Sequence, residues 1–334
     1  MLKYILKRLA LLVPVIIGVS VLVFLVMHVF TTDPASIILG QHATAEQVEK
    51  LREELGLNKP LYVQYFMFMK GVLHGNFGNS LITKTSVTNE ILSRFPATIE
   101  LALVAIIIAS IFGILMGILS AVKQNSIVDY ISMFVSLIGV SMPIFWLGLM
   151  LIVLFSVKLH LLPVSGRITI GMEPIHITGL YLIDSLVSGN MAAFKDSLKH
   201  LILPSIALAS YSTAIIARMT RSTMLEIIQQ DYIRTARAKG LFEKTVILKH
   251  ALRNALIPIT TVIGLQLGSL LGGAVLTETV FSWPGVGSYT IDAILKSDYP
   301  VVQGAVMIFA TVFVLVNLVV DLLYAYLDPR IKYS

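Results

Sequence analysis

The chain has 334 residues, of which 56% are hydrophobic and only 13% are charged. Soluble domains carry about 25% charged residues, so this composition excludes an ordinary soluble protein and predicts a chain embedded in lipid. The net charge of +6 is not arranged as a basic stripe with interleaved aromatic residues, so nucleic-acid binding is not expected. The sequence has no cysteine, which excludes disulfides and thiol chemistry.

Six apolar stretches are long enough to cross a bilayer, whose core of about 30 Å takes about 20 residues of helix. The first has no small-residue cleavage site after its apolar run, so we expect a retained helix and not a signal peptide. Pro143 interrupts the third stretch, which is either one kinked span or two short ones. We take it as one span, because two spans would reverse the inside–outside pattern of the basic residues that follow. The predicted fold class is an all-α polytopic membrane protein with six transmembrane helices. These are residues 9–30, 99–122, 131–157, 201–218, 257–281 and 301–326.

Two longer segments lie between the spans, residues 31–98 and 158–200. The first contains AEQVEKLREELG, whose apolar residues recur at helical spacing before Gly56, which predicts a short surface helix. Orientation follows from the basic residues, because cytoplasmic loops carry an excess of Lys and Arg. With the N-terminus inside, the inner segments hold 14 of the 25 Lys and Arg residues, and the outer ones hold 11 over about twice the length. We therefore expect both termini and the 218–256 loop in the cytoplasm.

The 218–256 loop contains a short basic amphipathic segment, DYIRTARAKG. At helical spacing Tyr232, Ile233 and Ala236 share one side, while basic and hydroxyl side chains cover the rest. Gly240 supplies a helix stop. The pattern predicts a helix that contacts another molecule. The segment consists of Asp231, Tyr232, Ile233, Arg234, Thr235, Ala236, Arg237, Ala238, Lys239 and Gly240.

This loop resembles the cytoplasmic loop of ABC importer permeases, and the resemblance continues beyond it. TARAKG, HALRNALIP, TETVFSWPGVG and DYPVVQG occur in the order typical of the peptide-importer branch, and GNFGNSL and FPATIEL resemble its outer segments. The insertion at 158–200, with LPVSGR and ITGLYLIDS, is closest to the dipeptide permeases of this binding-protein-dependent transport family. Arg234, Thr235 and Ala236 stand where the wider family has Glu-Ala-Ala, a departure that fits the peptide branch.

The resemblance implies an ABC importer type I permease fold and a translocation subunit that is not an enzyme. Residues 1–30 would form an N-terminal transmembrane helix and 31–94 an extracytoplasmic region with short surface helices. Residues 95–326 would form the permease domain, with a coupling loop at 218–256, and 327–334 a cytoplasmic tail. In that family the coupling segment sits in a cleft of the ATPase. The residues implied in coupling are Asp231, Tyr232, Arg234, Thr235, Ala236, Arg237, Lys239 and Gly240.

The resemblance also implies a set of partners in the cytoplasmic (inner) membrane. These are a homologous second permease subunit, two ATPase subunits that use ATP and Mg, an extracytoplasmic substrate-binding protein, and membrane lipid. The implied substrates are dipeptides or short peptides. Nickel chelates and glutathione are the alternatives within the same architecture.

The sequence lacks the motifs of several kinds of chemistry. No Gly-Lys-Ser or Gly-Lys-Thr occurs, so we expect no nucleotide site and no cofactor bound by this chain. The seven histidines never fall at the i, i+3 or i, i+4 spacing that places two ligands on one helix face, so no metal site is expected. A membrane enzyme is an alternative from another class, but no Gly-x-Ser-x-Gly elbow is present. A secondary transporter is a further alternative, which would need inverted repeats and paired midplane charges that the sequence does not show.

Small and hydroxyl residues in two spans are candidates for the pathway. Gly264, Gly268 and Gly272 repeat every four residues, which allows close helix packing within the chain or close contact with a second permease. Ser212 and Thr213 in the fourth span either bond back to their own helix or form a polar face for a peptide.

Polar and aromatic residues near the ends of the last spans have two interpretations each. Glu278, Trp283 and Pro284 close the fifth span, where aromatic anchoring at the membrane surface competes with a role in an outer gate or in docking the binding protein. Asp321 is an acid inside the sixth span, and such acids are normally paired. We expect an ion pair with Arg218 or Arg221, in preference to a proton relay.

Overall fold

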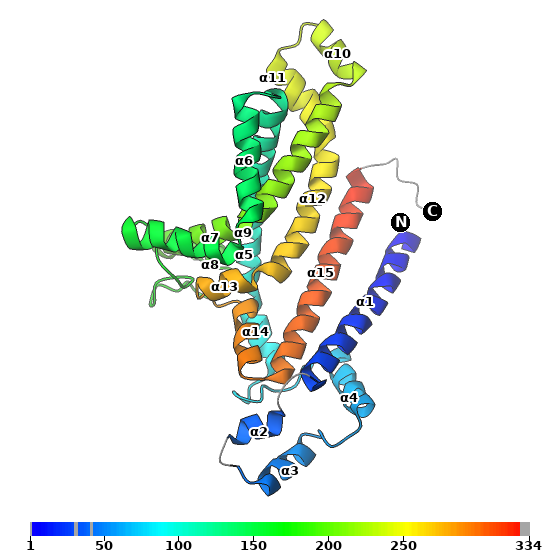
Figure 1. Ribbon diagram of the computed structural model, residues 1–334, viewed down its shortest axis with the longest axis vertical. Helices are drawn as coiled ribbons and strands as arrows, with labels where there is room; N and C mark the ends of the chain where they lie inside the picture. The colour runs from blue at the N-terminus through cyan, green and yellow to red at the C-terminus, as the bar shows by residue number, and fades with distance from the viewer. Residues whose placement is uncertain (1, 30–32, 41–42, 328–334) are drawn as a thin grey trace.

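The computed structural model describes residues 2–29, 33–40 and 43–327. Figure 1 shows an elongated helical protein with α10 and α11 at one end and α2 and α3 at the other. Over these residues the only extended pairing is an isolated bridge between Asn79 and Ser86, so the all-α fold class is confirmed. The elements are α1 (Leu2–Val29), α2 (Pro34–Leu39), α3 (Ala45–Glu54), α4 (Leu61–Leu73), α5 (Val87–Val122), α6 (Ile127–Ser141), α7 (Ile144–Leu151), the π-helix η1 (Ile152–Lys158), α8 (Tyr181–Val187), α9 (Met191–Ile228), α10 (Asp231–Ala238), α11 (Glu243–Thr245), the π-helix η2 (Val246–Ala251), α12 (Leu252–Gly273), α13 (Val275–Val280), α14 (Val286–Leu295) and α15 (Tyr299–Leu327).

Several of these helices are suited to cross a membrane. In the described part of the chain, four helical ranges are long and apolar enough, namely Val87–Val122, Met191–Ile228, Glu243–Gly272 and Tyr299–Val320. α1 has 28 residues, of which Val13–His28 is the apolar part. The chain is therefore a multi-pass membrane protein. Of the tail expected at 327–334, residues 328–334 lie outside the described residues.

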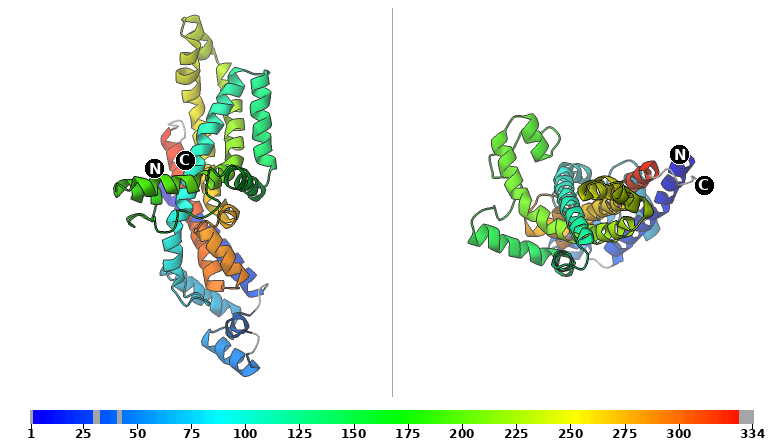
Figure 2. Two further views of the ribbon diagram at one scale, coloured as in Figure 1. Left: turned by 90° about the vertical axis from the view of Figure 1, so that its left-hand side faces the viewer. Right: turned by 90° about the horizontal axis from the view of Figure 1, so that it is seen from above.

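The expected third span, residues 131–157, is a broken helix in the structure. α6 ends at Ser141, and the helix axis turns by 106° before α7 and η1. Pro143 explains the break, because a proline has no N–H to donate and pushes the residue before it out of the helical conformation. Met142 accordingly has an extended ψ of 130°. Figures 1 and 2 show α7 running across the direction of α6.

α5 and α9 form the central packed pair of the bundle. Both begin well before the expected spans, at Val87 and Met191; α5 extends toward the end that holds α2 and α3, whereas the first part of α9 packs with α7 and α8. Small residues allow their close approach. A Cβ added at Gly113 would lie 2.8 Å from Ile216, closer than real side chains approach.

A buried ion pair joins α6 to α9. The Asp129 carboxylate is 2% exposed and accepts two hydrogen bonds of 2.8 Å from the Arg221 guanidinium and a third from the Ser120 hydroxyl of α5. Arg221 is therefore paired with Asp129, and the expected ion pair of Asp321 with Arg218 or Arg221 stays a prediction. The side chain of Asp321 lies outside the described residues. Since an unpaired buried charge is costly, this pair fixes the positions of three helices at one level.

Candidate functional site

α10 is a short helix seated on the end of the bundle. Figure 1 shows it beyond the end of α12, at the far end from α2 and α3. Ile233 is fully buried and Ala236 is 7% exposed, and both belong to the main apolar cluster. Val246 and Ile247 of η2 belong to the same cluster. This apolar edge holds α10 between the end of α9 and the start of α12, so a displacement of α10 moves both helices.

The other sides of α10 are exposed. The Arg234 side chain is 76% exposed, and Phe242 just after the helix is 86% exposed. The sequence placed Tyr232 with the buried side, but it is 44% exposed, and its hydroxyl accepts a hydrogen bond from the Asn254 amide at 2.8 Å. Ala236, one of the residues implied in coupling, faces the core beside Ile233, so it does not contribute to the exposed surface of α10. The α10 surface therefore consists of Asp231, Tyr232, Arg234, Thr235, Arg237, Lys239, Gly240 and Phe242.

The geometry of the α10 surface is fixed from within the chain. Gly240 ends the segment with φ of 75°, a left-handed conformation that a glycine adopts without strain. Arg237 donates two hydrogen bonds, of 3.1 and 2.7 Å, to the Glu243 carboxylate. These bonds raise the pKa of Arg237 above its ordinary value. Arg234 has only a 3.5 Å contact with Asp231, so its charge is directed to the outside.

The glycine stripe of α12 faces two different environments. A Cβ added at Gly264 would lie 2.6 Å from Val320 Cγ1, and one at Gly268 would lie 3.3 Å from the Phe313 ring. Both positions therefore serve packing against α15 of the same chain. At Gly272 no atom from another described helix lies within 4 Å of such a Cβ. Contact with a second permease subunit stays a prediction for Gly272 alone.

The two hydroxyls proposed for the pathway are engaged within the chain. Ser212 is 1% exposed and donates to the Gln266 side-chain oxygen at 3.0 Å, which joins α9 to α12. Thr213 donates to the Ala209 carbonyl at 2.8 Å, so it bonds back to its own helix. Gln266 was not predicted from the sequence as a site residue, although an amide side chain inside an apolar span signals that it needs a hydrogen-bond partner.

A hollow with an apolar and a polar side, called the polar hollow here, lies nearer to α10. Its volume is about 580 Å³, and it opens to the outside of the chain between α6, α9 and α12. Arg218, Arg221 and Ser222 of α9 supply its polar wall. Arg221 is held by Asp129, whereas Arg218 is exposed. The hollow thus places two positively charged side chains on a helix surface that is otherwise apolar.

Two of the residues expected at an outer gate, Glu278 and Trp283, belong to a buried cluster. Trp283 is 1% exposed, and its indole N–H donates to the Ala97 carbonyl of α5 at 2.9 Å, so anchoring at the membrane surface is wrong for it. Glu278 is fully buried and accepts hydrogen bonds from the Thr98 hydroxyl at 2.7 Å and from the Ser288 N–H at 2.9 Å. These contacts hold α13 and α14 against α5. Pro284 is exposed, and a role in an outer gate stays a prediction for all three residues.

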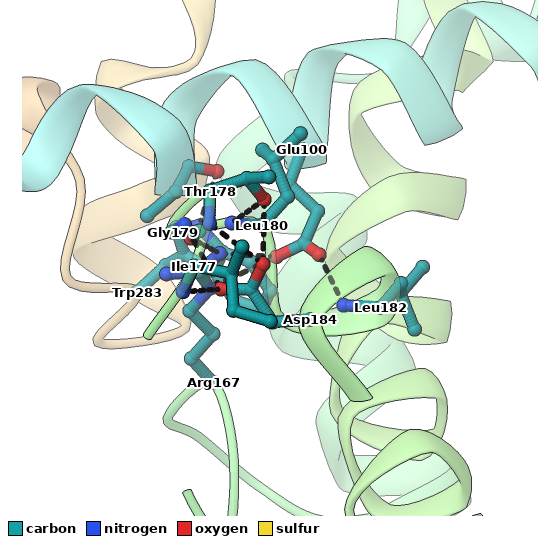
Figure 3. Close-up of polar contacts among 10 residues, drawn as sticks. Glu100, Arg167, Ile177, Thr178, Gly179, Leu180, Leu182, Asp184 and Trp283 are labelled. Carbon is teal, nitrogen blue, oxygen red and sulfur yellow. Dashed lines mark hydrogen bonds and ion pairs between the residues drawn. The ribbon is translucent and has the colours of Figure 1, made fainter. Parts of the chain in front are cut away.

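Residues 159–190, the part of the 158–200 segment between η1 and α9, are called the insertion below. They are held by an ion pair that was not predicted from the sequence. Arg167 donates to Glu100 Oε2 from Nε at 2.9 Å and from Nη2 at 2.5 Å, and the two residues are 7% and 5% exposed. The guanidinium also lies 3.8 Å from the centre of the Tyr181 ring. Figure 3 shows that Glu100 comes from α5 and that its second oxygen faces Leu182, whose N–H lies 2.8 Å away. The insertion is thus clamped to a membrane helix.

Asp184 organises the loop before α8. Its carboxylate accepts hydrogen bonds from the N–H groups of Ile177, Thr178 and Gly179 and from the Thr178 hydroxyl, as Figure 3 shows. Burial acts to raise the pKa of Asp184, but these hydrogen bonds together lower it below its ordinary value. The Gly179 carbonyl accepts from Arg167 at 2.7 Å, so the loop and the ion pair form one unit.

Among the described residues, no group of three or more His, Cys, Asp or Glu side chains is placed to hold a metal ion. The candidate site is therefore a set of surfaces: α10 with its exposed basic side chains, the polar hollow beside it, and the clamped insertion at the other end of the membrane helices.

These features define a membrane-transport subunit, and a solved structure shows the same fold. The MetNI methionine ABC transporter, in an inward-facing conformation, matches 71% of this chain and 96% of its own with a TM-score of 0.53 at 17% identity. Residues 113–333 match the family "Binding-protein-dependent transport system inner membrane component", and residues 1–102 match its N-terminal part. The chain belongs to this family of membrane components, whose members act in a complex with other subunits.

Relatives resemble the chain over its whole length. The dipeptide transport system permease protein DppB of Alkalihalophilus pseudofirmus is 53% identical over 333 residues, which is 100% of both chains. The di/tripeptide transport system permease protein DppB of Pseudomonas aeruginosa is 50% identical over 335 residues, again 100% of both.

Proposed function

We propose that this chain is the permease subunit of an ATP-driven importer that moves dipeptides or short peptides across the cytoplasmic membrane. The names and the full-length identity of the two relatives support the substrate class. The clamped insertion lies near one end of α6 and α12, and α10 lies beyond their other end. This arrangement supports a division of roles, in which one end receives the substrate and the other end contacts the ATPase. Both termini and α10 are proposed to be cytoplasmic, and labelling of a cysteine placed at Lys244 from the cytoplasmic side alone tests this orientation.

The observation that carries the proposal is the α10 surface. A basic helix with an exposed tyrosine and an exposed phenylalanine has no covering segment within the described part of this chain. The chain also has no nucleotide-binding motif, so a partner must supply the energy. We propose that two ATPase subunits, using ATP and Mg, bind here, that a second permease completes the pathway, and that an external binding protein delivers the substrate.

The mechanism follows from how α10 is attached. Ile233 is buried against η2, and α10 follows α9 after two residues, so α10 cannot tilt without moving α9 and α12. Those two helices carry the bonded pair Ser212 and Gln266 and the wall of the polar hollow. Motion of the ATPase would thus change the spacing of the helices that border the pathway, while α10 itself stays rigid.

The test uses the complete transporter in vesicles, with uptake of labelled dialanine and ATP hydrolysis measured together. Arg234→Glu is the direct variant, because this side chain is 76% exposed and the substitution leaves the fold intact. Like charges across an interface cost several kcal/mol, so we expect uptake and substrate-stimulated hydrolysis both to fall by about tenfold or more. Lys50→Glu on the exposed surface of α3 is the matched control, with wild-type activity expected.

Arg237 needs a paired design, because it binds Glu243 within the chain. The single substitution Arg237→Glu breaks this internal ion pair as well as any contact with the ATPase, so its effect would have two causes. The exchange of both residues, Arg237→Glu with Glu243→Arg, keeps the pair and reverses its direction. Loss of coupling in the exchanged variant supports a charge-specific partner. Full coupled uptake in both the Arg234→Glu and the exchanged variant contradicts the ATPase contact.

The substrate class has a separate test, in which unlabelled compounds compete with the uptake of labelled dialanine. Competition by glutathione or a nickel chelate, but not by a second dipeptide, contradicts the proposed substrate class.

A further inference from the structure

A cavity lies at the end of the bundle opposite α10, where α1, α4 and α15 meet. Its volume is about 440 Å³. α1 contacts both α4 and α15, and Figure 1 shows the C-terminal end of α1 beside the start of α15. The loop before α5 closes another side through Asn79 and Lys84. This cavity is separate from α10, from the polar hollow and from the clamped insertion.

The wall of the cavity combines an apolar side with a side that favours anions. Phe24, Phe68 and Leu57 are among its apolar residues. Lys84 and His28 are its basic residues, and none of the described residues that line it is Asp or Glu. A wall with a cation and no carboxylate favours a ligand that carries negative charge and an apolar part.

One polar group in this wall lacks a partner. Gln303 lines the cavity and is 6% exposed, and its amide nitrogen makes no hydrogen bond among the described residues. A buried donor without an acceptor costs about 1–3 kcal/mol. The nearby Asp298 does not supply the acceptor, because its carboxylate receives the Ser80 hydroxyl at 2.5 Å and the Leu81 N–H at 3.1 Å. A bound molecule with an acceptor group would satisfy this donor.

α4 indicates what surrounds the cavity. It borders the cavity through Gln64, Met67 and Phe68, while other large apolar side chains on it are exposed. Tyr62 is 76% exposed and Phe66 is 72% exposed. A helix that exposes aromatic side chains of this kind is typical of the membrane surface, where it lies with its apolar face in lipid. The cavity therefore opens beside lipid.

We propose that this cavity binds an anionic phospholipid. The acyl chain occupies the side formed by Phe24, Phe68 and Leu57, and the phosphate group receives hydrogen bonds from Lys84 and Gln303. A zwitterionic dipeptide fits less well, because its ammonium group would meet no carboxylate in the wall. The bound lipid joins α1 and α4 to α15, so it stabilises the N-terminal part of the fold.

The experiment measures lipid retained by the purified transporter complex, using native mass spectrometry and thermal unfolding after delipidation. The probes are dioleoylphosphatidylglycerol, dioleoylphosphatidylcholine, inorganic phosphate and dialanine. We expect phosphatidylglycerol to bind and to raise the unfolding temperature, with phosphatidylcholine weaker and with no effect of inorganic phosphate or dialanine. Lys84→Glu, at an exposed position in a loop, is expected to weaken phosphatidylglycerol binding by about tenfold or more.

Two further variants separate this site from general attraction of lipid to the surface. Lys70→Glu makes the same charge change on the exposed side of α4, outside the cavity, and should leave retention unchanged. Gln303→Leu keeps the size of the side chain and removes the donor, so retention should fall without loss of the folded complex. Equal retention by Lys84→Glu and wild type, or displacement of the lipid by dialanine or inorganic phosphate, would overturn the proposal.

Discussion

Removal of Arg167 should release the 159–190 insertion from α5. In Arg167→Met the Glu100 carboxylate loses both guanidinium hydrogen bonds and keeps the Leu182 N–H at 2.8 Å. Glu100 is 5% exposed, so its charge stays buried with one donor. Breaking a buried pair by removing one partner costs about 3–5 kcal/mol. Loss of the stacking on Tyr181 adds about 1–2 kcal/mol.

The double variant separates the charge from the packing. Glu100→Gln with Arg167→Met replaces the pair with neutral groups of similar size, and such replacements are often close to neutral for stability. We expect the double variant to be more stable than Arg167→Met alone by about 2–3 kcal/mol. The remaining loss reflects the stacking and the hydrogen bond from Arg167 to the Gly179 carbonyl.

Proteolysis of the folded complex by a protease of broad specificity measures this effect, because cleavage of an external segment tracks its local opening. A loss of about 3 kcal/mol corresponds to cleavage about 100-fold faster. Lys195→Met removes an exposed positive charge near the insertion and serves as the control, with wild-type cleavage expected. Cleavage of Arg167→Met at the wild-type rate, or no recovery in the double variant, would refute the role of the ion pair.

Three further outcomes are expected. Gly264→Ala should destabilise the packing of α12 on α15 by about 1–3 kcal/mol, because its Cβ lies 2.6 Å from Val320 Cγ1, whereas Gly272→Ala should leave the unfolding temperature of the isolated chain unchanged. Asp184→Asn should speed proteolysis of the insertion, since a hydrogen bond to a charged group contributes about 1.5–3 kcal/mol. The folded pKa of Asp184 lies below 3.8, so its contribution is present above that pH and is lost as the pH falls through the folded pKa. Proteolysis in the wild type should therefore be constant between about pH 5 and pH 8 and should rise only in stronger acid.

Local patterns in the sequence predicted α10 well. Its apolar edge, its basic side chains and its terminal glycine lie within ten residues, and the hydrophobic pattern alone places Ile233 and Ala236 inward. Tyr232 shows the limit of such a pattern, because an amphipathic side chain at the boundary of the apolar stripe turns outward when a partner such as Asn254 is available.

Contacts between distant residues could not be predicted from one sequence. Glu100 and Arg167 are 67 residues apart, and nothing in the pattern of either segment specifies the other. A carboxylate in an apolar span does signal that a partner exists, but not which one. Trp283 was misplaced for the same reason: its position after a span suggests the membrane surface, and only the packing of α13 and α14 on α5 buries it.

The polar groups of this chain explain why a single copy cannot form the pathway. In the described part of the bundle, Ser212 and Thr213 are bonded within the chain, and the cavity between α12 and α15 is lined almost wholly by apolar side chains. The polar hollow with Arg218 and Ser222 is open on its outer side. A peptide carries polar groups along its whole backbone and cannot cross such a surface while facing lipid. We therefore propose that a homologous permease subunit, placed against α6, α9 and α12, covers the hollow and completes the pathway.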